Sequence, residues 1–591
     1  MAINRRQAAF EARTTAAQLA RDRIHPDHIA NGDEERYATA HYMMCFTKGL
    51  EHDALGLVKD PNHFLAFRRA IDEGFVDAFT RDVTPSPEKR RAWEAPTAGV
   101  VYDLQGHDPQ AVTMPPAPAL CSDELTFEMA EVYELALVRD VPFTEFEGDT
   151  PTAITPSVDR LNDLQFAQDG FPGTRGRISD TDTTLNAQTA FRGSSPGCAT
   201  GPYLSQFMLI GNPDLSAGAT GATSVADGQI TYGAQTIDQR VPAAPEHVDY
   251  MQTWDDYTAV QNGADTRMNA VLFKGADRRF IATPRDLATY VHDDALYQAY
   301  LNACMILLGM RAPFDPGFDA LSGMGKFSTT PAQRQAGGFA LYGGPHILTL
   351  VTEIATRGLK AVRFQKFNNH IRLRPEALAA RLEKASEIEG AFPCIGTCLT
   401  QMCSDISKTL HKIKEKNAKV ANAADFLLPM AFQEGSPMHP AYGAGHATVA
   451  GACVTILKAF FDTDAVLVET EEDSKDAHGN PIKQKVIRFK RMGTDDVPVN
   501  FVPKADGSAL MPVAEPECLT LEGELNKLAA NISIGRNMAG VHYYSDYYDS
   551  LRMGEEIAIG MLEEQALCYP TDPFVLTVPT FDGPVRRIGR R

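Results

Sequence analysis

Apolar residues recur at three- and four-residue spacing through most of the second half of the sequence, which is the period of a helix with one buried face. The pattern covers residues 293–310, 345–367, 374–389, 446–461 and 524–564. Between the last two, AVLVET and KVIRFK flank the turn-prone segment DAHGNP, which predicts a β-hairpin within 462–517. The second half is therefore predicted to be packed helices with one hairpin.

The first half is less regular. Residues 1–95 favour helices that carry mixed charge, whereas residues 96–275 are rich in Pro, Gly, Thr and Asp. The latter composition is typical of long ordered loops with short helices and a small hairpin. We predict a mainly α protein, with 1–284 as a helical and loop-rich part and 285–591 as a helical part of one compact unit.

Net charge narrows the range of partners. The chain has 591 residues, of which 56 are basic and 76 acidic, giving a formal net charge of −20. This balance argues against nucleic acid or an anionic membrane as a general partner. Any site for a small anion must then be locally basic, so clustered Lys and Arg residues are informative here.

The sequence shows neither a recognisable targeting signal nor a complete zinc motif. The N-terminal stretch is charged throughout and has no apolar run typical of a secretory signal, so a cytoplasmic location is the default, with other export routes left open. No stretch has the 18 uninterrupted apolar residues expected of a membrane span. Ten cysteines are scattered, and the group Cys394, Cys398 and Cys403 lacks a second cluster to complete a zinc site. Free thiols are expected, and disulfides stay open.

The segment KFNNHIRLRP (366–375) carries the first cationic cluster. Lys366 should lie late in one helix, and Pro375 is typical of the first position of the next. The proline holds Arg374 in an extended conformation, so its guanidinium can project away from both helices. The same residues would also suit a solvated basic helix end, which the helix macrodipole favours.

The segment SPMHPAYGAGHATVAGA (436–452) places His446 directly after Gly445 and among other small residues. If a helix begins at His446, the small residues would let an anion reach unpaired backbone N–H groups at its N-terminus. The alternative is that the helix start packs closely against a neighbour, with His446 as a core or capping histidine.

The segment GRNMAGVHYYSD (535–546) contains Arg536, His542 and Asp546. On a helix His542 and Asp546 would share a face, so the carboxylate could orient the imidazole or an adjacent arginine. Arg536 lies among apolar and small residues, and an arginine on a buried helix needs a partner. A structural Arg–Asp pair is the alternative interpretation.

Together and in this order, the three segments resemble the signature of the vanadium-dependent haloperoxidases and of the related phosphatidate-phosphatase-type acid phosphatases. Longer stretches, GGPHILTLVTEIATRGLKAV and NISIGRNMAGVHYYSD among them, look very like the bromoperoxidases of red algae and their cyanobacterial relatives. The resemblance is close over about 285–565 and weaker in the first half. It implies a mainly α fold built around two four-helix bundles, with long loops and a few short β-hairpins.

The resemblance also implies roles for individual residues. His542 would bind vanadium directly, and His446 would be the acid–base residue, with Asp546 behind the site. The Arg363 and His439 side chains would form the bromide pocket. The vanadate oxygens would be bound by Lys366, Arg374, Arg536 and the Gly445 backbone N–H. Forked arginine donors and a helix N-terminus suit an oxyanion, and a neutral imidazole suits the metal.

Two positions depart from the family pattern. Ala444 stands where the family has a serine, so one hydrogen bond to an oxyanion is expected to be lost, at a cost of about 1 kcal/mol. Red-algal members also carry a structural calcium site supplied partly by aspartates shortly before the GGPH segment. Residues 326–340 contain no carboxylate here, which argues against that calcium site.

The implied activity is the two-electron oxidation of bromide by hydrogen peroxide on vanadate, giving hypobromous acid or an equivalent that halogenates small organic acceptors. Neither haem nor flavin is required. The resemblance also implies a large homo-oligomer, a dodecamer in the red-algal relatives. Two alternatives remain at this point. One is an acid phosphatase in which His542 attacks phosphorus, and the other is a non-enzymatic anion-binding assembly protein.

Overall fold

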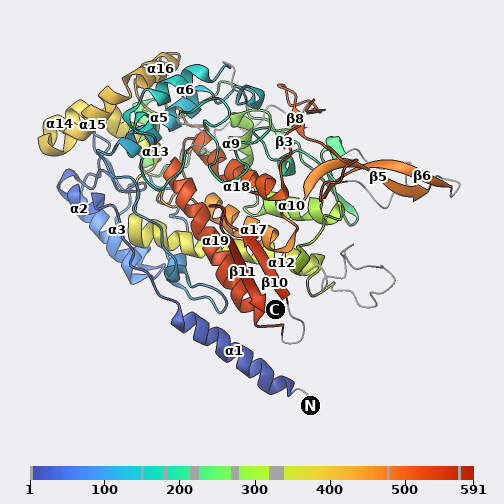
Figure 1. Ribbon diagram of the computed structural model, residues 1–591. Coiled ribbons are helices and arrows are strands. Elements are labelled where there is room, and N and C mark those ends of the chain that lie inside the picture. The colour runs from blue at the N-terminus through green and yellow to red at the C-terminus, as the bar shows by residue number, and fades with distance from the viewer. Residues whose placement is uncertain are drawn as a thin grey trace.

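The helices that the apolar periodicity predicts are present and form most of the regular structure (Figure 1). The computed structural model describes residues 4–147, 152–177, 184–212, 225–267, 278–317, 339–475, 480–514, 516–569 and 574–590. Within these ranges the strands form only small sheets of two or three strands, so the mainly α class is confirmed. None of the helices described is both long and apolar enough to cross a bilayer.

Four long helices from the second half pack together at the centre of the molecule (Figure 1). Helix α17 (Gly445–Phe460) packs against α12 (Gly344–Phe364), α18 (Leu521–Met538) and α19 (Tyr544–Ala566). All its residues from Ala447 to Phe460 are buried, as its nearly continuous apolar sequence requires. At its crossing with α19 a Cβ on Gly451 would lie 1.9 Å from the Leu551 carbonyl oxygen, so only glycine allows this approach.

A second group of helices lies beside this bundle (Figure 1). Helix α5 (Asp123–Leu137) packs against α16 (Ser407–Asn417), α6 (Thr155–Asn162), α7 (Gln165–Gln168) and α18. The chain between the bundles forms α13 (Pro375–Glu383), α14 (Ala385–Ala391) and α15 (Pro393–Asp405). Helices α8 (Trp254–Gln261), α9 (Pro284–Asp293) and α10 (Gln298–Gly309) complete the body, and α9 packs on α18.

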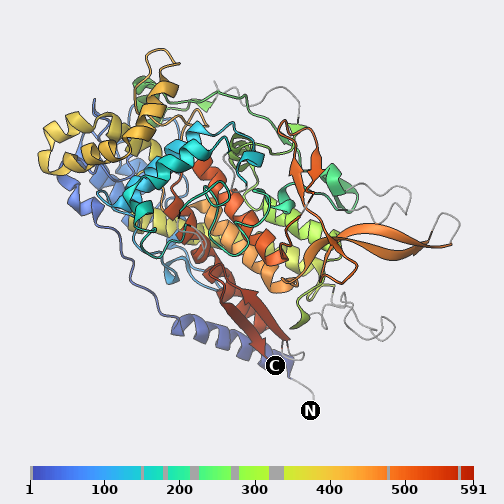
Figure 2. The ribbon, with the colours of Figure 1, turned by 45° about the horizontal axis from the view of Figure 1, so that its top comes forward.

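The strands form antiparallel pairs, as expected for short hairpins. The predicted hairpin is present as β5 (Val466–Lys475) and β6 (Pro481–Lys490), and its projecting ribbon is seen in Figure 2. The short β7 (Val497–Pro498) pairs with β5, whereas residues 476–479 of the predicted turn lie outside the described residues. The smaller sheets are β1 (Gln229–Tyr232) with β2 (Gln235–Asp238), β3 (Val241–Pro242) with β4 (Arg278–Arg279), β8 (Phe501–Pro503) with β9 (Leu510–Pro512), and β10 (Phe574–Pro579) with β11 (Val585–Arg590).

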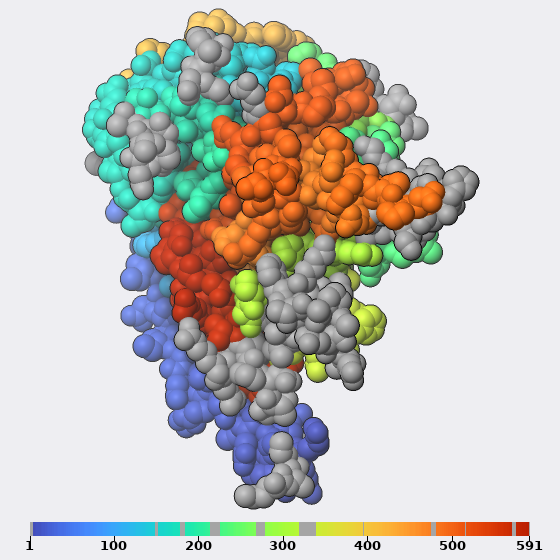
Figure 3. Space-filling model, turned by 45° about the vertical axis from the view of Figure 1, so that its right-hand side comes forward, coloured from blue at the N-terminus to red at the C-terminus, as the bar shows by residue number. Residues whose placement is uncertain are grey.

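The N-terminal segment is helical but only partly packed. Helix α1 (Arg5–Asp22) projects from the body and has no buried residue (Figure 3). The shorter α2 (Asp33–Arg36), α3 (Pro61–Glu73) and α4 (Ala78–Arg81) follow. Apolar side chains of α3 pack with Phe367, which supports the chain just after α12. The first part of the chain therefore contributes directly to the support of the Lys366 segment.

One pair of cysteines is bonded, although free thiols were expected. A disulfide joins Cys121 to Cys398, whose Cα atoms lie 5.2 Å apart although they are 277 residues apart in sequence, so not all thiols are free. Only the fold brings these two positions together, so spacing along the chain could not reveal the bond. The stretch 326–340, on which the calcium prediction rests, lies outside the described residues except for 339–340.

Candidate active site

The three predicted segments meet at one buried place between α12, α17 and α18. Lys366 follows α12, Arg536 lies in the last turn of α18, and His542 comes just before α19. Burial lowers the pKa of His542 well below its usual value, and the charges of Arg374, Lys366 and Arg536 lower it further. The predicted cationic residues therefore surround one neutral imidazole.

Lys366 lies in a short π-helical segment, η9 (Gln365–His370), that continues from α12. Short π-helical segments within α-helices are frequent at functional sites. Its side chain is fully buried, and Nζ donates to the carbonyl oxygens of Pro440 (2.7 Å) and Ala441 (3.1 Å). Burial, followed by the charges of Arg374 and Arg363, lowers the pKa of Lys366 well below its usual value.

Arg374 connects two histidines of the site. Its backbone is extended at the N-cap of α13, as predicted from Pro375. Nη1 donates to His542 Nε2 (3.0 Å), and Nη2 donates to His439 Nδ1 (2.7 Å). Further bonds run to the carbonyl oxygens of Val541 and His439, and burial lowers the pKa of Arg374 to about 10.

The other side of the His542 ring is held by Asp546. Asp546 Oδ2 lies 2.7 Å from His542 Nδ1 and also accepts the backbone N–H of Tyr543 at 3.0 Å. Nδ1 therefore carries the proton, and the Nε2 lone pair faces the cations. The predicted contact is present, but its stated reason is wrong. His542 precedes α19, so the two residues do not share a helix face.

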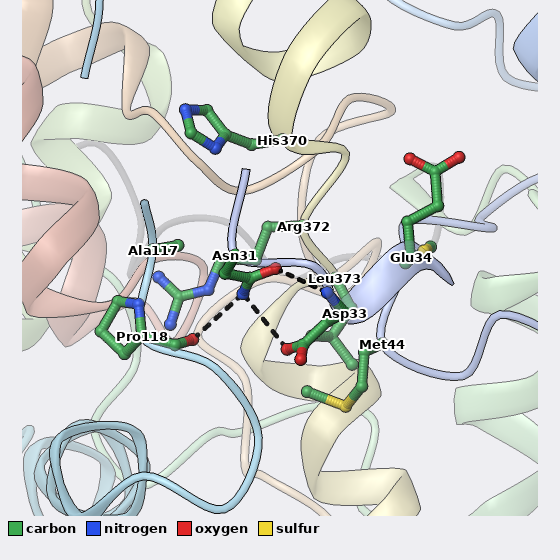
Figure 4. Close-up of a pocket in the computed structure, with 10 residues that line it drawn as sticks. Asn31, Asp33, Glu34, Met44, Ala117, Pro118, His370, Arg372 and Leu373 are labelled. Carbon is green, nitrogen blue, oxygen red and sulfur yellow. Dashed lines mark hydrogen bonds between the residues drawn. The ribbon is translucent and has the colours of Figure 1, made fainter. Parts of the chain in front are cut away.

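Arg372 was not among the predicted site residues, yet it donates to Asp546 Oδ1 at 2.9 Å and to Glu128 Oε2 at 3.1 Å. The sequence signal for Arg372 was its position two residues before Arg374 in an extended segment. Alternate residues of an extended chain face the same side, so both arginines could have been predicted near the site. Figure 4 shows Arg372 beside the turn of Asn31 and Asp33. The cavity there has a volume of about 10 Å³, which is at the lower limit for one water molecule.

The N-terminus of α17 presents uncapped backbone donors. Its N-cap is Ala444, which offers no side-chain oxygen, while its own N–H donates to Ser550 Oγ at 2.8 Å. The backbone N–H groups of Gly445 and His446 find no acceptor among the residues that the structure describes. A Cβ built on Gly445 would find its nearest neighbour, Leu359 Cδ2, only at 3.8 Å. The helix end is therefore open to an anion.

His446 pairs with a carboxylate that was not predicted from the sequence. Its Nε2 lies 3.0 Å from Oδ1 of Asp294, the residue that caps the C-terminus of α9. Burial disfavours the Asp294 carboxylate, yet His446 and then Arg536 lower its pKa overall. The signal in the sequence was two aspartates at a helix C-terminus, where the macrodipole disfavours negative charge.

Arg536 is buried without the structural aspartate partner that was the alternative prediction. Nη1 donates to the Val291 carbonyl oxygen at 2.8 Å, and the guanidinium lies over the Phe432 ring. In the described part of the chain no carboxylate lies within ion-pair distance, and Nε is buried with no hydrogen-bond acceptor. A buried guanidinium with an unmet donor is suited to a bound anion.

Arg363 and His439 lie on either side of one carboxylate. Glu94 Oε2 is 3.5 Å from His439 Nε2 and 3.9 Å from Arg363 Nη2. Burial lowers the pKa of Arg363 to about 10, and its Nη1 is buried with no acceptor among the described residues. The fold therefore brings the two predicted halide residues together at the edge of the cationic cluster.

Several known proteins are similar to this chain. Residues 411–567 match a family model described as the VCPO second helical-bundle domain. The chain is 40% identical to the vanadium-dependent bromoperoxidase of Corallina officinalis, and the match covers 98% of each protein. It is 30% identical to the enzyme of that name from Ascophyllum nodosum, over 92% of this chain and 85% of the relative.

A solved structure of similar fold is described as the homohexameric second vanadate-dependent bromoperoxidase of Ascophyllum nodosum. It has a TM-score of 0.76 and 25% sequence identity, and the match covers 99% of this chain and 90% of that one. The full-length identity to Corallina officinalis, together with the fold, shows that the chain belongs to the vanadium-dependent bromoperoxidases.

Proposed function

We propose that this chain binds vanadate among Lys366, Arg374, Arg536 and the N-terminus of α17, and there oxidises bromide with hydrogen peroxide. The observation that carries the proposal is the Nε2 lone pair of a neutral, fully buried His542 that faces buried cations. A lone imidazole ligand suits a metal, and the cations suit its oxygens. A purely structural cluster would leave this concentration of positive charge unexplained.

The donors present fit a tetrahedral oxyanion. Arg536 Nε and the Gly445 and His446 amides have no acceptor among the described residues, so each has a free hydrogen bond to offer. Lys366 and Arg374 add charge from the opposite segment. His542 would hold vanadium through Nε2 once Arg374 Nη1, which now donates to that nitrogen, bonds an oxygen instead.

Vanadate, when bound, supplies a Lewis acid that polarises the peroxide. In the overall reaction bromide loses two electrons, the O–O bond breaks, and one proton is taken up to form hypobromous acid and water. His446 is placed to move that proton, with Asp294 holding its Nε2–H. The Nε2–H of His439 and the guanidinium of Arg363 are the donors proposed for bromide.

One assay tests the proposal against both alternatives. Vanadium-free protein is mixed with vanadate, peroxide and bromide, and bromination of a phenol dye is followed beside hydrolysis of a phosphate ester. We expect vanadate-dependent bromination that requires bromide. Ester hydrolysis without bromination would indicate the phosphatase, and neither activity would indicate an anion-binding protein.

Ala444→Ser is expected to tighten vanadate binding. A serine hydroxyl at the N-cap of α17 would donate to an anion at this helix end, and hydrogen bonds to charged acceptors contribute about 1.5–3 kcal/mol. Each 1.4 kcal/mol corresponds to about tenfold in affinity. The measurement is a vanadate titration of the two vanadium-free proteins by recovered activity, with and without competing phosphate. Equal affinities and no phosphate competition would mean that the helix end does not face the anion.

We also propose that the chain forms a homo-oligomer, with a dodecamer as the assembly that the red-algal resemblance implies. Helix α1 buries none of its residues, and Phe10 on it is 65% exposed, which suits contact with another copy. We expect light scattering to give a mass of at least six chains. The mass of a single chain would contradict the proposal.

A further inference from the structure

Glu94 is fixed beside the predicted halide residues by the backbone. Its N–H donates to the Met438 carbonyl oxygen at 3.0 Å, and its Oε1 accepts the Met438 N–H at 3.3 Å. Met438 directly precedes His439. The two hydrogen bonds therefore join the loop after α4 to the segment before α17 next to His439. The Glu94 side chain remains 42% exposed, so it is in contact with solvent.

The Glu94 carboxylate faces the N–H donors that a halide would use. His439 Nδ1 lies 2.7 Å from Arg374 Nη2, which can only donate, and 3.2 Å from the Pro440 carbonyl oxygen, which can only accept. The shorter contact makes Nδ1 the acceptor, so the proton of the neutral His439 ring is on Nε2. His439 Nε2 lies 3.5 Å from Glu94 Oε2, and Arg363 Nη2 lies 3.9 Å from the same oxygen. Charge-assisted hydrogen bonds are usually about 2.7–2.9 Å long. These longer contacts indicate a loose, displaceable pairing.

Two buried carboxylates near the site, unlike the partly exposed Glu94, are hydrogen-bonded to other groups. Asp546 is bonded to His542 and Arg372, and Asp294 is bonded to His446. The negative charge of Glu94 raises the pKa of Arg363 against the larger effect of burial. Among the residues that the structure describes, Glu94 is the carboxylate within ion-pair distance of both predicted halide residues.

We propose that Glu94 is a specificity-determining residue whose carboxylate competes with bromide for the N–H donors of Arg363 and His439. Bromide and a carboxylate oxygen would accept from the same donors, and two negative charges so close repel. Bromide entry therefore requires Glu94 to turn away from the pair, which weakens halide binding. This inference rests on the proposed function and on the bromide pocket assigned there.

Glu94→Gln tests the proposal because it removes the charge and keeps Oε1 as the acceptor for the Met438 N–H. The vanadate-loaded variant is compared with the wild type at constant ionic strength. We expect the KM for bromide to fall about tenfold, which corresponds to about 1.4 kcal/mol. The KM for peroxide and kcat should change by less than about twofold, because neither depends on halide affinity.

Glu88→Gln is the matched control, since it makes the same charge change on an exposed loop residue six positions away. All its constants should equal those of the wild type. Bromide affinity is also measured without turnover, from the broadening of the bromide NMR signal by the vanadate-loaded proteins, and should follow the KM values.

Two failures are distinguishable. If Glu94→Gln is active but has the wild-type KM and the wild-type bromide affinity, Glu94 only holds Met438 and the inference is overturned. If wild type and both variants retain vanadium but show no bromide-dependent turnover, the proposed function is wrong. This inference, which depends on it, is then wrong as well.

Discussion

His542→Ala is expected to lose vanadium retention and to lower bromide oxidation by more than about 100-fold. Loss of a residue that merely orients a metal ligand costs about 10–100-fold in affinity or activity, so loss of the ligand itself should cost more. The protein should still fold, because Asp546 keeps its bonds to Arg372 and to the Tyr543 N–H. The removed hydrogen bond contributes about 1.5–3 kcal/mol, so a lower Tm is expected.

Vanadium retained after desalting is measured by elemental analysis, alongside the bromination rate. Added imidazole should restore part of the retention, since it can fill the space of the missing ring and offer its lone pair to the metal. His411→Ala is the control, because His411 is exposed on α16. Wild-type vanadium content in His542→Ala would refute the ligand assignment.

His446→Gln should retain vanadium and turn over about 10²–10⁴-fold more slowly, which is the usual contribution of a positioned acid–base group. The glutamine amide can still donate to Asp294, so the buried carboxylate keeps a partner, but it cannot transfer a proton. An alanine at this position would instead leave the Asp294 charge unpaired and confuse stability with catalysis. The measurement is kcat at saturating peroxide together with vanadium content.

Asp294→Asn provides a graded comparison. It keeps an oxygen acceptor for His446 Nε2–H and removes only the charge, so turnover should fall less than in His446→Gln. Unchanged kcat in His446→Gln would remove His446 from its role. Loss of vanadium from His446→Gln would instead assign His446 to vanadate binding.

Local features of the sequence were enough to predict several elements that carry the site. Pro375 marks the start of α13 and holds Arg374 extended, and the small residues before His446 mark the start of α17. These signals work because backbone conformation at helix ends depends mainly on the nearest residues. The helical periodicity worked for the same reason. For 96–275 the composition predicted only long loops with short helices and a small hairpin, without the path of the chain.

The sequence by itself thus determined the helices of the second half, since prolines and periodic apolar positions act locally. The donors expected around an anion were predicted from the resemblance to a known family. Only the tertiary structure decided which acidic groups pair with the side chains of the site. It joined Asp294 to His446, Arg372 to Asp546, and Glu94 to His439 and Arg363. It also left Arg536 Nε without a hydrogen-bond acceptor among the described residues and closed the Cys121–Cys398 bond. These pairings join residues at least 152 positions apart, and they follow from how packed helices bring distant side chains together, which no short stretch of sequence encodes.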